Sequence, residues 1–214
     1  IYIADGHHRS AGADRAAAAA AAANPTHRGD EEYGRFLAVV FPHDQMTILP
    51  YNRVVKDLGG LDAEAFLARL REIGSLEPSD GRTPERPGTV EVRVAGRWWS
   101  LAFPPDSIDR DDPIASLDVS LLQDRVLTPV LGIGDPRTDP RLDFVGGSRG
   151  RDELERRAGA EGVAFLMHPT SADELLAVAD AGEIMPPKST WFEPKLRSGL
   201  FVHEFERIPE AVLA

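Results

Sequence analysis

Short apolar runs of the kind that form β-strands recur along the first half of the chain. They cover residues 1–4, 36–41, 46–49, 89–94 and 97–103. Turn-forming residues separate 36–41 from 46–49, and 89–94 from 97–103, which predicts two β-hairpins. The run 89–94 alternates apolar and polar residues, as a strand with one buried face does.

Two helices are predicted in the same half. Residues 7–23 contain eight consecutive alanines, and alanine has the highest helix propensity. The Asn-Pro pair that follows ends this helix, because proline disfavours helical backbone at and before its own position. A second helix is expected over 62–73, with Asp62 as its N-cap and apolar residues recurring on one face. The stretch 75–88 is rich in proline, glycine and charge and is expected to be an exposed loop.

The second half of the chain alternates helices and strands. A Ser-Ala-Asp-Glu capping box opens one of these helices, and a glycine ends it. The expected elements, in chain order, are helix 117–127, strand 142–145, a helix ending near 158, strand 162–167, helix 171–181 and a last hairpin of 191–193 with 199–204.

These elements predict an α+β (mixed α/β) fold, because hairpins and strand–helix units occur together. We expect a single domain over residues 1–214, with a candidate internal boundary at the acidic connector 104–113. The chain begins on an apolar strand without an initiator methionine. We therefore interpret it as the C-terminal fragment of a longer protein, with a fold that is incomplete at its N-terminus.

Composition narrows the function classes. The chain has 24 Lys+Arg against 35 Asp+Glu, a formal charge of -11, which argues against a nucleic-acid binder held by phosphate contacts. The absence of cysteine excludes disulfides, Cys-ligated metal sites and thiol catalysis, and is compatible with a reducing cytoplasm. No apolar run approaches the roughly 20 residues that span a bilayer. We expect a cytoplasmic protein that binds a small molecule; the oligomeric state stays open.

The strongest chemical signal is Asp5-Gly6-His7-His8-Arg9, between a predicted strand and a long helix. A helix N-terminus offers free N–H groups and a positive dipole end, which together bind phosphate. Gly6 lets a ligand approach the backbone, and the planar guanidinium of Arg9 suits phosphate oxygens. His7 and His8 can donate hydrogen bonds or move protons, and Asp5 could hold a metal or accept a proton. The alternative is that Asp5 merely caps the helix and both histidines are surface residues.

A second candidate lies near the end of the chain. Lys188-Ser189-Thr190 follows two prolines, and Lys195 is close behind. Two cations and two hydroxyls beside a rigid turn could form another wall of an anion pocket. The upstream glycines of a P-loop are missing. The alternative is a loop packed by its neighbouring aromatic residues, with its cations in water.

The chain resembles the C-terminal part of the DUF 1015 family, a domain of unknown function. The opening ADGHHR is similar to the family's central motif, and FLMHPTSADELLAVADAGEIMPPKSTWFEPKLRSGLFVH to its ending. LPYNRVVKDL and SLDVSLLQDRVLTPVLGI also match. The resemblance covers essentially the whole chain, and the family name implies no activity.

The strand–DGHHR–helix unit also resembles the phosphate-binding motif of the ParB/sulfiredoxin superfamily, which includes a free serine kinase. The resemblance implies that Gly6, His8 and Arg9 contact nucleotide phosphates with Mg²⁺, and that Asp5 lies near the transfer site or the metal. His7 stands at the motif's variable position. In the kinase branch a further acidic residue comes from an earlier segment, which here would precede Ile1.

Three hypotheses follow. The first is a phosphotransferase that binds ATP, ADP or CTP with Mg²⁺ and acts on a small hydroxyl-bearing metabolite. Asp5 and His8 would be catalytic, with Asp5 also the metal ligand; the phosphate-binding residues would be Gly6, His7, Arg9, Lys188, Ser189, Thr190 and Lys195. The second is a non-catalytic nucleotide-binding switch. The third is a metal-dependent phosphoesterase or nuclease, which the acidic charge disfavours.

Overall fold

The computed structural model describes residues 1–197 and 199–204, and of His8 it describes the backbone alone. The chain divides into two compact units. The first combines Ile1–Met46 with the described residues from Pro194 onward, and the second is Thr47–Glu193. The connector 104–113 lies inside the second unit. No helix among the described residues is long and apolar enough to cross a membrane.

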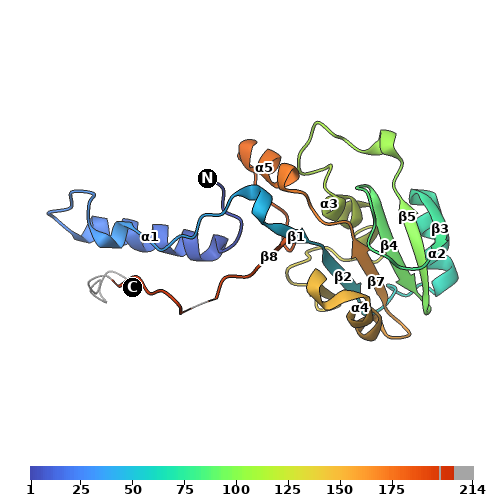
Figure 1. Cartoon of the computed structure of the whole chain (residues 1–214). Coiled ribbons are helices and arrows are strands. Elements are labelled where there is room, and N and C mark those ends of the chain that lie inside the picture. The colour runs from blue at the N-terminus through green and yellow to red at the C-terminus, as the bar shows by residue number, and fades with distance from the viewer. Residues whose placement is uncertain (198, 205–214) are drawn as a thin grey trace. The chain divides into compact units, whose positions relative to one another are not determined.

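The second unit is built on a six-stranded sheet in which every neighbouring pair is antiparallel (Figure 1). The order across the sheet is β3 (Ser75–Ser79), β5 (Arg97–Ala102), β4 (Thr89–Val94), β7 (Val163–Met167), β2 (Tyr51–Val55), β6 (Leu142–Gly146). A separate two-stranded sheet pairs β1 (Thr47–Leu49) with β8 (Trp191–Glu193). The mixed α/β class predicted from the sequence is confirmed.

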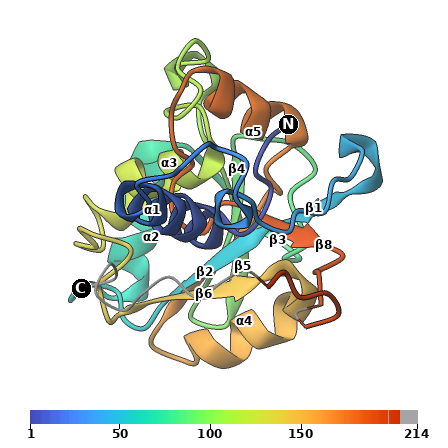
Figure 2. The ribbon, with the colours of Figure 1, turned by 90° about the vertical axis from the view of Figure 1, so that its left-hand side faces the viewer.

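Helices cover both faces of the large sheet (Figure 2). They are α2 (Ala63–Ile73), α3 (Asp118–Leu122) continuing as a π-helical turn (Gln123–Leu127), α4 (Gly150–Ala158) and α5 (Ala172–Asp180). Short 3-10 turns occupy Glu32–Gly34, His43–Gln45, Pro105–Ser107 and Gly147–Arg149. The caps follow the sequence: Asp62 accepts from the Ala65 amide at 2.8 Å, and Ser171 forms the expected capping box with Glu174.

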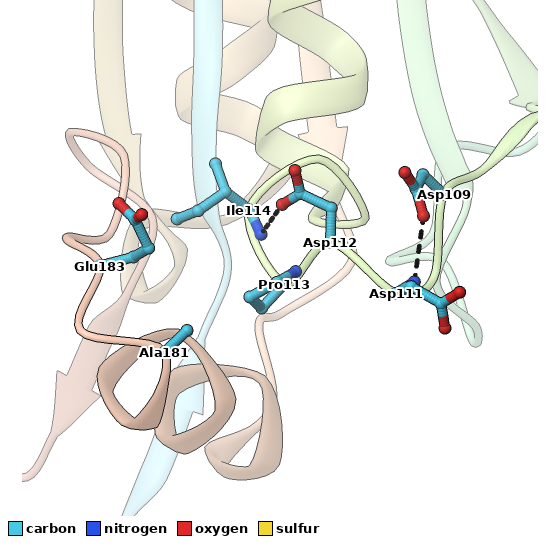
Figure 3. A pocket seen from close by; sticks show the side chains of 7 residues that line it. All are labelled: Asp109, Asp111, Asp112, Pro113, Ile114, Ala181 and Glu183. Atoms are coloured by element: carbon cyan, nitrogen blue, oxygen red, sulfur yellow. Dashed lines mark hydrogen bonds between the residues drawn. The ribbon is translucent and has the colours of Figure 1, made fainter.

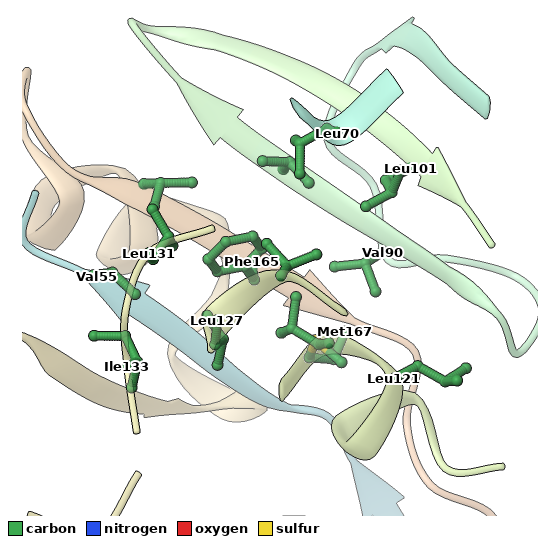
Figure 4. Packing of buried hydrophobic residues seen from close by; sticks show 14 of the residues in the cluster. Val55, Leu70, Val90, Leu101, Leu121, Leu127, Leu131, Ile133, Phe165 and Met167 are labelled. Atoms are coloured by element: carbon green, nitrogen blue, oxygen red, sulfur yellow. The ribbon is translucent and has the colours of Figure 1, made fainter. Parts of the chain in front are cut away.

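The core follows from strand alternation. On the central strand β7, Phe165 and Met167 face the larger apolar cluster with α2 and α3 (Figure 4). Ala164 and Leu166 face the other side, where they pack with Leu154 of α4. A sheet with two buried faces fixes its register strongly, because a slip of one residue would exchange the two apolar sets.

The first unit contains α1 (His7–Ala23), with the bounds that its alanine content predicts. The expected strands 1–4 and 36–41 do not form. Neither segment has a hydrogen-bonded neighbour strand among the described residues, and a strand exists through such pairing. Their apolar side chains stay exposed, for example 68% at Val40 and 57% at Phe36.

Three further expectations for strands are corrected. Thr47–Leu49 pairs with Trp191–Glu193 rather than with 36–41, and 199–204 forms no strand. The stretch 75–88, expected as a loop, begins with β3, which contains Pro78. The proline is accommodated because β3 is an edge strand that pairs with β5 alone.

Candidate functional site

The Asp5–Arg9 motif lies at the start of α1. Gly6 is the residue before the helix, in left-handed backbone with φ 88° and ψ 24°. The first helical amide bonded within the helix is that of Ser10, which donates to the Gly6 carbonyl at 2.9 Å. The amides that precede it in the helix are therefore available to another acceptor. A left-handed residue here explains the glycine, because other residues adopt this conformation at a cost.

The guanidinium of Arg9 folds back over this helix start. A Cβ at Gly6 would lie 3.2 Å from Nη2 and 3.3 Å from Nε of Arg9. A larger residue at position 6 would therefore crowd the guanidinium as well as strain the backbone. The arginine is exposed, so its planar fork faces solvent beside the free amides. The Arg9 guanidinium and the free backbone amides are thus brought together at the start of α1.

Asp5 is held by two donors. Its Oδ1 accepts from the Gly6 amide at 2.7 Å, and its Oδ2 accepts from the Lys195 ammonium at 2.9 Å. No side-chain cap hydrogen bond forms at α1, so Asp5 does not act as the N-cap. The hydrogen bond from Lys195 is the main reason that the pKa of Asp5 is lowered from its ordinary value, with the Gly6 amide and Arg9 adding to it. Asp5 is therefore an ionised carboxylate at neutral pH.

The Asp5–Lys195 pair joins two motifs that are 190 residues apart in the sequence. Both side chains are partly exposed, 51% and 41% respectively, so the pair is open to solvent and to a ligand. His7 is exposed on the first turn of α1. The side chain of His8, predicted to be catalytic, lies outside the described part of the structure.

The other predicted phosphate-binding residues, Lys188, Ser189 and Thr190, belong to the second unit. Lys188 has φ 58°, and Ala95 in the β4–β5 turn is the other non-glycine residue with positive φ in the described chain. Its ammonium lies 5.6 Å from the centre of the Tyr51 ring. Backbone conformations of this kind cost free energy and cluster at functional sites. Lys188 is therefore a cation fixed against an aromatic face.

Ser189 is 4% exposed, and its hydroxyl donates to the Pro186 carbonyl at 2.6 Å. Its own carbonyl accepts from the Thr170 hydroxyl at 3.2 Å. These bonds give Ser189 a structural part in the turn that presents Lys188. Thr190 is half-buried and leads directly into β8.

An acidic cleft of about 610 Å³ lies elsewhere in the second unit (Figure 3). Four carboxylates line it, together with Pro113, Ile114 and Ala181: those of Asp109, Asp111, Asp112 and Glu183. Asp109 and Asp112 accept backbone hydrogen bonds within their own loop, which shape that loop. A surface of this charge repels phosphate, so this cleft is not a candidate nucleotide site. Among residues 1–197 and 199–204, no group of three or more His, Asp or Glu side chains is arranged to hold a metal ion.

Three buried charged residues were missed from the sequence. Glu91 on β4 is 6% exposed and accepts a hydrogen bond from the Ser79 hydroxyl. Arg53 on β2 is 4% exposed, and Asp118 at the start of α3 is 8% exposed. Burial lowers the pKa of Arg53 to about 10, and burial raises the pKa of Asp118 to about 6. The sequence feature that could have indicated the burial of Arg53 and Asp118 is a single charged residue within an apolar run, in YNRVV and in SLDVSLL.

Comparison with known proteins gives one family. The family described as "Protein of unknown function (DUF1015)" matches residues 1–120, more than half of the chain. Among curated proteins, none matches this sequence.

Several solved structures are similar at low identity. A variant of the free serine kinase in complex with AMP is 14% identical with TM-score 0.46, over 89% of this chain and 66% of that chain. SbnI with a C-terminal truncation, from Staphylococcus aureus, is 13% identical with TM-score 0.41, over 76% and 55%. A conserved hypothetical protein from Pyrococcus furiosus is 13% identical with TM-score 0.41, over 89% and 68%. This chain therefore spans about two thirds or less of the kinase and SbnI structures, and likeness of this degree does not transfer a ligand.

Proposed function

The chain belongs to the DUF1015 family of proteins of unknown function, and we propose that it is the nucleotide-phosphate-binding part of a phosphotransferase. Its substrate would be a small hydroxyl-bearing metabolite. The observation that carries the proposal is the start of α1, where free backbone amides, the Arg9 guanidinium and the Asp5–Lys195 pair meet.

The chemistry of phosphoryl transfer fits this set of groups. The transferred group carries negative charge that must be positioned and neutralised, and the protein supplies mostly hydrogen-bond donors and cations for this. Arg9 would hold phosphate oxygens with its planar fork, and Gly6 would let them reach the backbone amides. His7 would add a donor from the first turn. Lys195 would contribute a second cation.

Asp5 suits a metal-linked role better than a proton-accepting one. Its lowered pKa keeps it ionised and makes it a weak base. Mg²⁺ is commonly held by one or two carboxylates together with substrate phosphates. Asp5 would provide such a carboxylate, and Mg²⁺ would supply charge neutralisation on the phosphates. His8 is assigned the proton movement on the chemistry of imidazole.

The first experiment measures calorimetric binding of ATP, ADP and CTP, each with Mg²⁺, to the full-length protein. Arg9→Ala should weaken binding by about tenfold or more, the usual effect of losing a charge-assisted hydrogen bond. The matched control is Arg15→Ala, which removes the same charge from an exposed position on the same helix. Nucleotide binding should survive in the control. Absence of binding to the parent protein, or equal binding by Arg9→Ala, contradicts the proposal.

A second assay separates an enzyme from a switch. Release of ADP from ATP in the presence of hydroxyl-bearing metabolites supports the phosphotransferase. Binding without turnover across such acceptors favours the nucleotide-binding switch, and metal-dependent hydrolysis of a generic phosphodiester favours the phosphoesterase. The net negative charge of the chain fits a small-molecule ligand rather than nucleic acid. The lack of cysteine is compatible with a protein of the reducing cytoplasm.

A further inference from the structure

Arg53 is a buried cation without an anionic partner. It lies on β2, between β6 and β7, so its backbone is fixed from both sides. One guanidinium nitrogen donates to the Tyr51 carbonyl, and the group stacks 5.5 Å from the centre of the Phe144 ring. No carboxylate of the described chain forms an ion pair with it. A guanidinium has five N–H donors, so most of them are left over.

A buried charge with unfilled donors is unfavourable unless something compensates it. Burial is the main cause of the lowered pKa of Arg53, about 10, which expresses the same penalty. In most proteins a buried guanidinium is paired with a carboxylate of the same chain. No carboxylate of the described residues lies at ion-pair distance from Arg53, which leaves its guanidinium open to an anion from outside the chain.

Arg53 lines a cleft of about 230 Å³ that could admit such an anion. The other polar residues of the lining are Ser120, Gln123 and Asp124. Much of the remaining wall is proline, including Pro186 and Pro187, which precede Lys188. A strand in mid-sheet and a proline wall make the cleft rigid, which reduces the entropy lost on binding.

Ser120 adds a hydroxyl to the wall of this cleft. The residue is 8% exposed and belongs to the cleft lining. A serine hydroxyl on the cleft wall can donate a hydrogen bond to a ligand that fills the cleft. Gln123 differs, because its amide nitrogen already donates to the Thr128 hydroxyl and the Ile133 carbonyl. The helix widens into a π-turn at Gln123, a feature frequent at functional sites.

We propose that this cleft binds a small molecule through an oxyanion, with Arg53 as the principal donor and Ser120 as the second. The oxyanion is a carboxylate or a phosphate group, since both match the guanidinium fork. The small volume and the apolar wall restrict the ligand to a compact molecule. Asp124 is exposed at the cleft and selects against highly charged anions. The site lies within the second unit and does not rest on the proposed function of the Asp5–Arg9 motif.

The test is calorimetric titration of the full-length protein with sodium phosphate and with sodium acetate and succinate, against sodium chloride at equal ionic strength. The phosphate arm uses the Arg9→Ala background, so that the motif at α1 does not contribute. Saturable binding of either anion, lost by about tenfold or more in Arg53→Met, supports the site. Arg97→Met, at an exposed arginine of β5, is the matched control and should bind like the parent protein.

Ser120→Ala keeps the test decisive if Arg53→Met does not fold, because it removes only a hydroxyl from the cleft wall and alanine favours the helix. It should weaken binding several-fold. Binding of phosphate alone assigns a phosphorylated ligand, and binding of carboxylates alone assigns an organic acid. The proposal is overturned if neither anion binds, or if Ser120→Ala and any folded Arg53→Met bind as tightly as the parent.

Failure here is distinguishable from failure of the proposed function. Nucleotide binding should be unaffected by Arg53→Met, and carboxylate binding should be unaffected by Arg9→Ala. Loss of all oxyanion binding in Arg9→Ala would assign the anion to the α1 motif and overturn the cleft site.

Discussion

Replacement of Asp118 by asparagine should change how the stability of the second unit depends on pH. The carboxyl is buried, and its Oδ1 accepts from the Gly88 amide at 2.6 Å. Its Oδ2 is buried without a hydrogen-bond partner in the described structure. Asparagine keeps the oxygen that Gly88 needs and cannot ionise. The substitution therefore removes the titration and preserves the shape.

The sign and size of the change in the free energy of unfolding follow from the pKa of Asp118 in the unfolded and in the folded state. Burial raises the pKa of Asp118 from 3.8 to about 6 in the folded state. Between these values the folded protein binds more protons than the unfolded protein, so the free energy of unfolding falls as pH rises. A difference of about two units, at about 1.36 kcal/mol per unit, is about 3 kcal/mol. This loss is absent below about pH 4 and complete above about pH 6.

Urea unfolding followed by tryptophan fluorescence measures this effect. All three tryptophans, Trp98, Trp99 and Trp191, lie in the second unit, so the signal reports that unit. The stability of Asp118→Asn relative to the parent should increase by about 3 kcal/mol between about pH 4 and pH 8. Asp106→Asn removes the same charge at an exposed position and should show no such change. A constant difference between Asp118→Asn and the parent across this range would refute the reasoning.

Two further substitutions test local contacts. Gly81→Ala should destabilise the second unit by about 2 kcal/mol or more, because φ is +69° and the new Cβ would lie 2.5 Å from the Trp98 ring. Gly60→Ala, at φ +87° with open space, should cost about 1 kcal/mol in the same urea assay; equal losses would contradict the packing argument. Lys195→Met should raise the pKa of Asp5 toward 3.8 in a carbon-detected NMR titration. An unchanged titration would show that this pair does not form in solution.

The helices were predictable because their signals are local. The alanine run and its Asn-Pro stop fix α1, and Asp62 fixes the start of α2. The capping box of α5 works through residues three positions apart. Each signal acts within one or two turns of the helix, so the printed sequence contains all the information needed.

Strand pairing was less predictable because it depends on distant residues. The hairpin arms β4 and β5 were found correctly, since a two-residue turn joins them. Residues 36–41 are as apolar as a buried strand but have no neighbour to bond with in the described structure. Thr47–Leu49 pairs with Trp191–Glu193, far along the chain, and no local pattern reveals this partner.

The candidate site also combines features that local sequence predicts with contacts between distant residues that it does not. The polar residues at the start of α1 could be singled out from the sequence because they open a long predicted helix. The Lys195 ammonium on Asp5 could not be predicted, because its partner is 190 residues away. Arg53 and Asp118 were missed because burial is a property of the fold, and a single charged residue in an apolar run is usually exposed.

Burial of an unpaired charge at Arg53 and at Asp118 disfavours folding of the second unit. The free-energy cost is removed in a different way at each residue. Neither has an oppositely charged side chain at ion-pair distance among the described residues, so each carries an uncompensated cost when ionised. Protonation removes the cost at Asp118 once the pH falls below its pKa of about 6. Arg53 stays charged at neutral pH, so an anion in its cleft is what can offset the cost there. The stability of this unit should therefore respond to pH through Asp118 and to oxyanion concentration through Arg53.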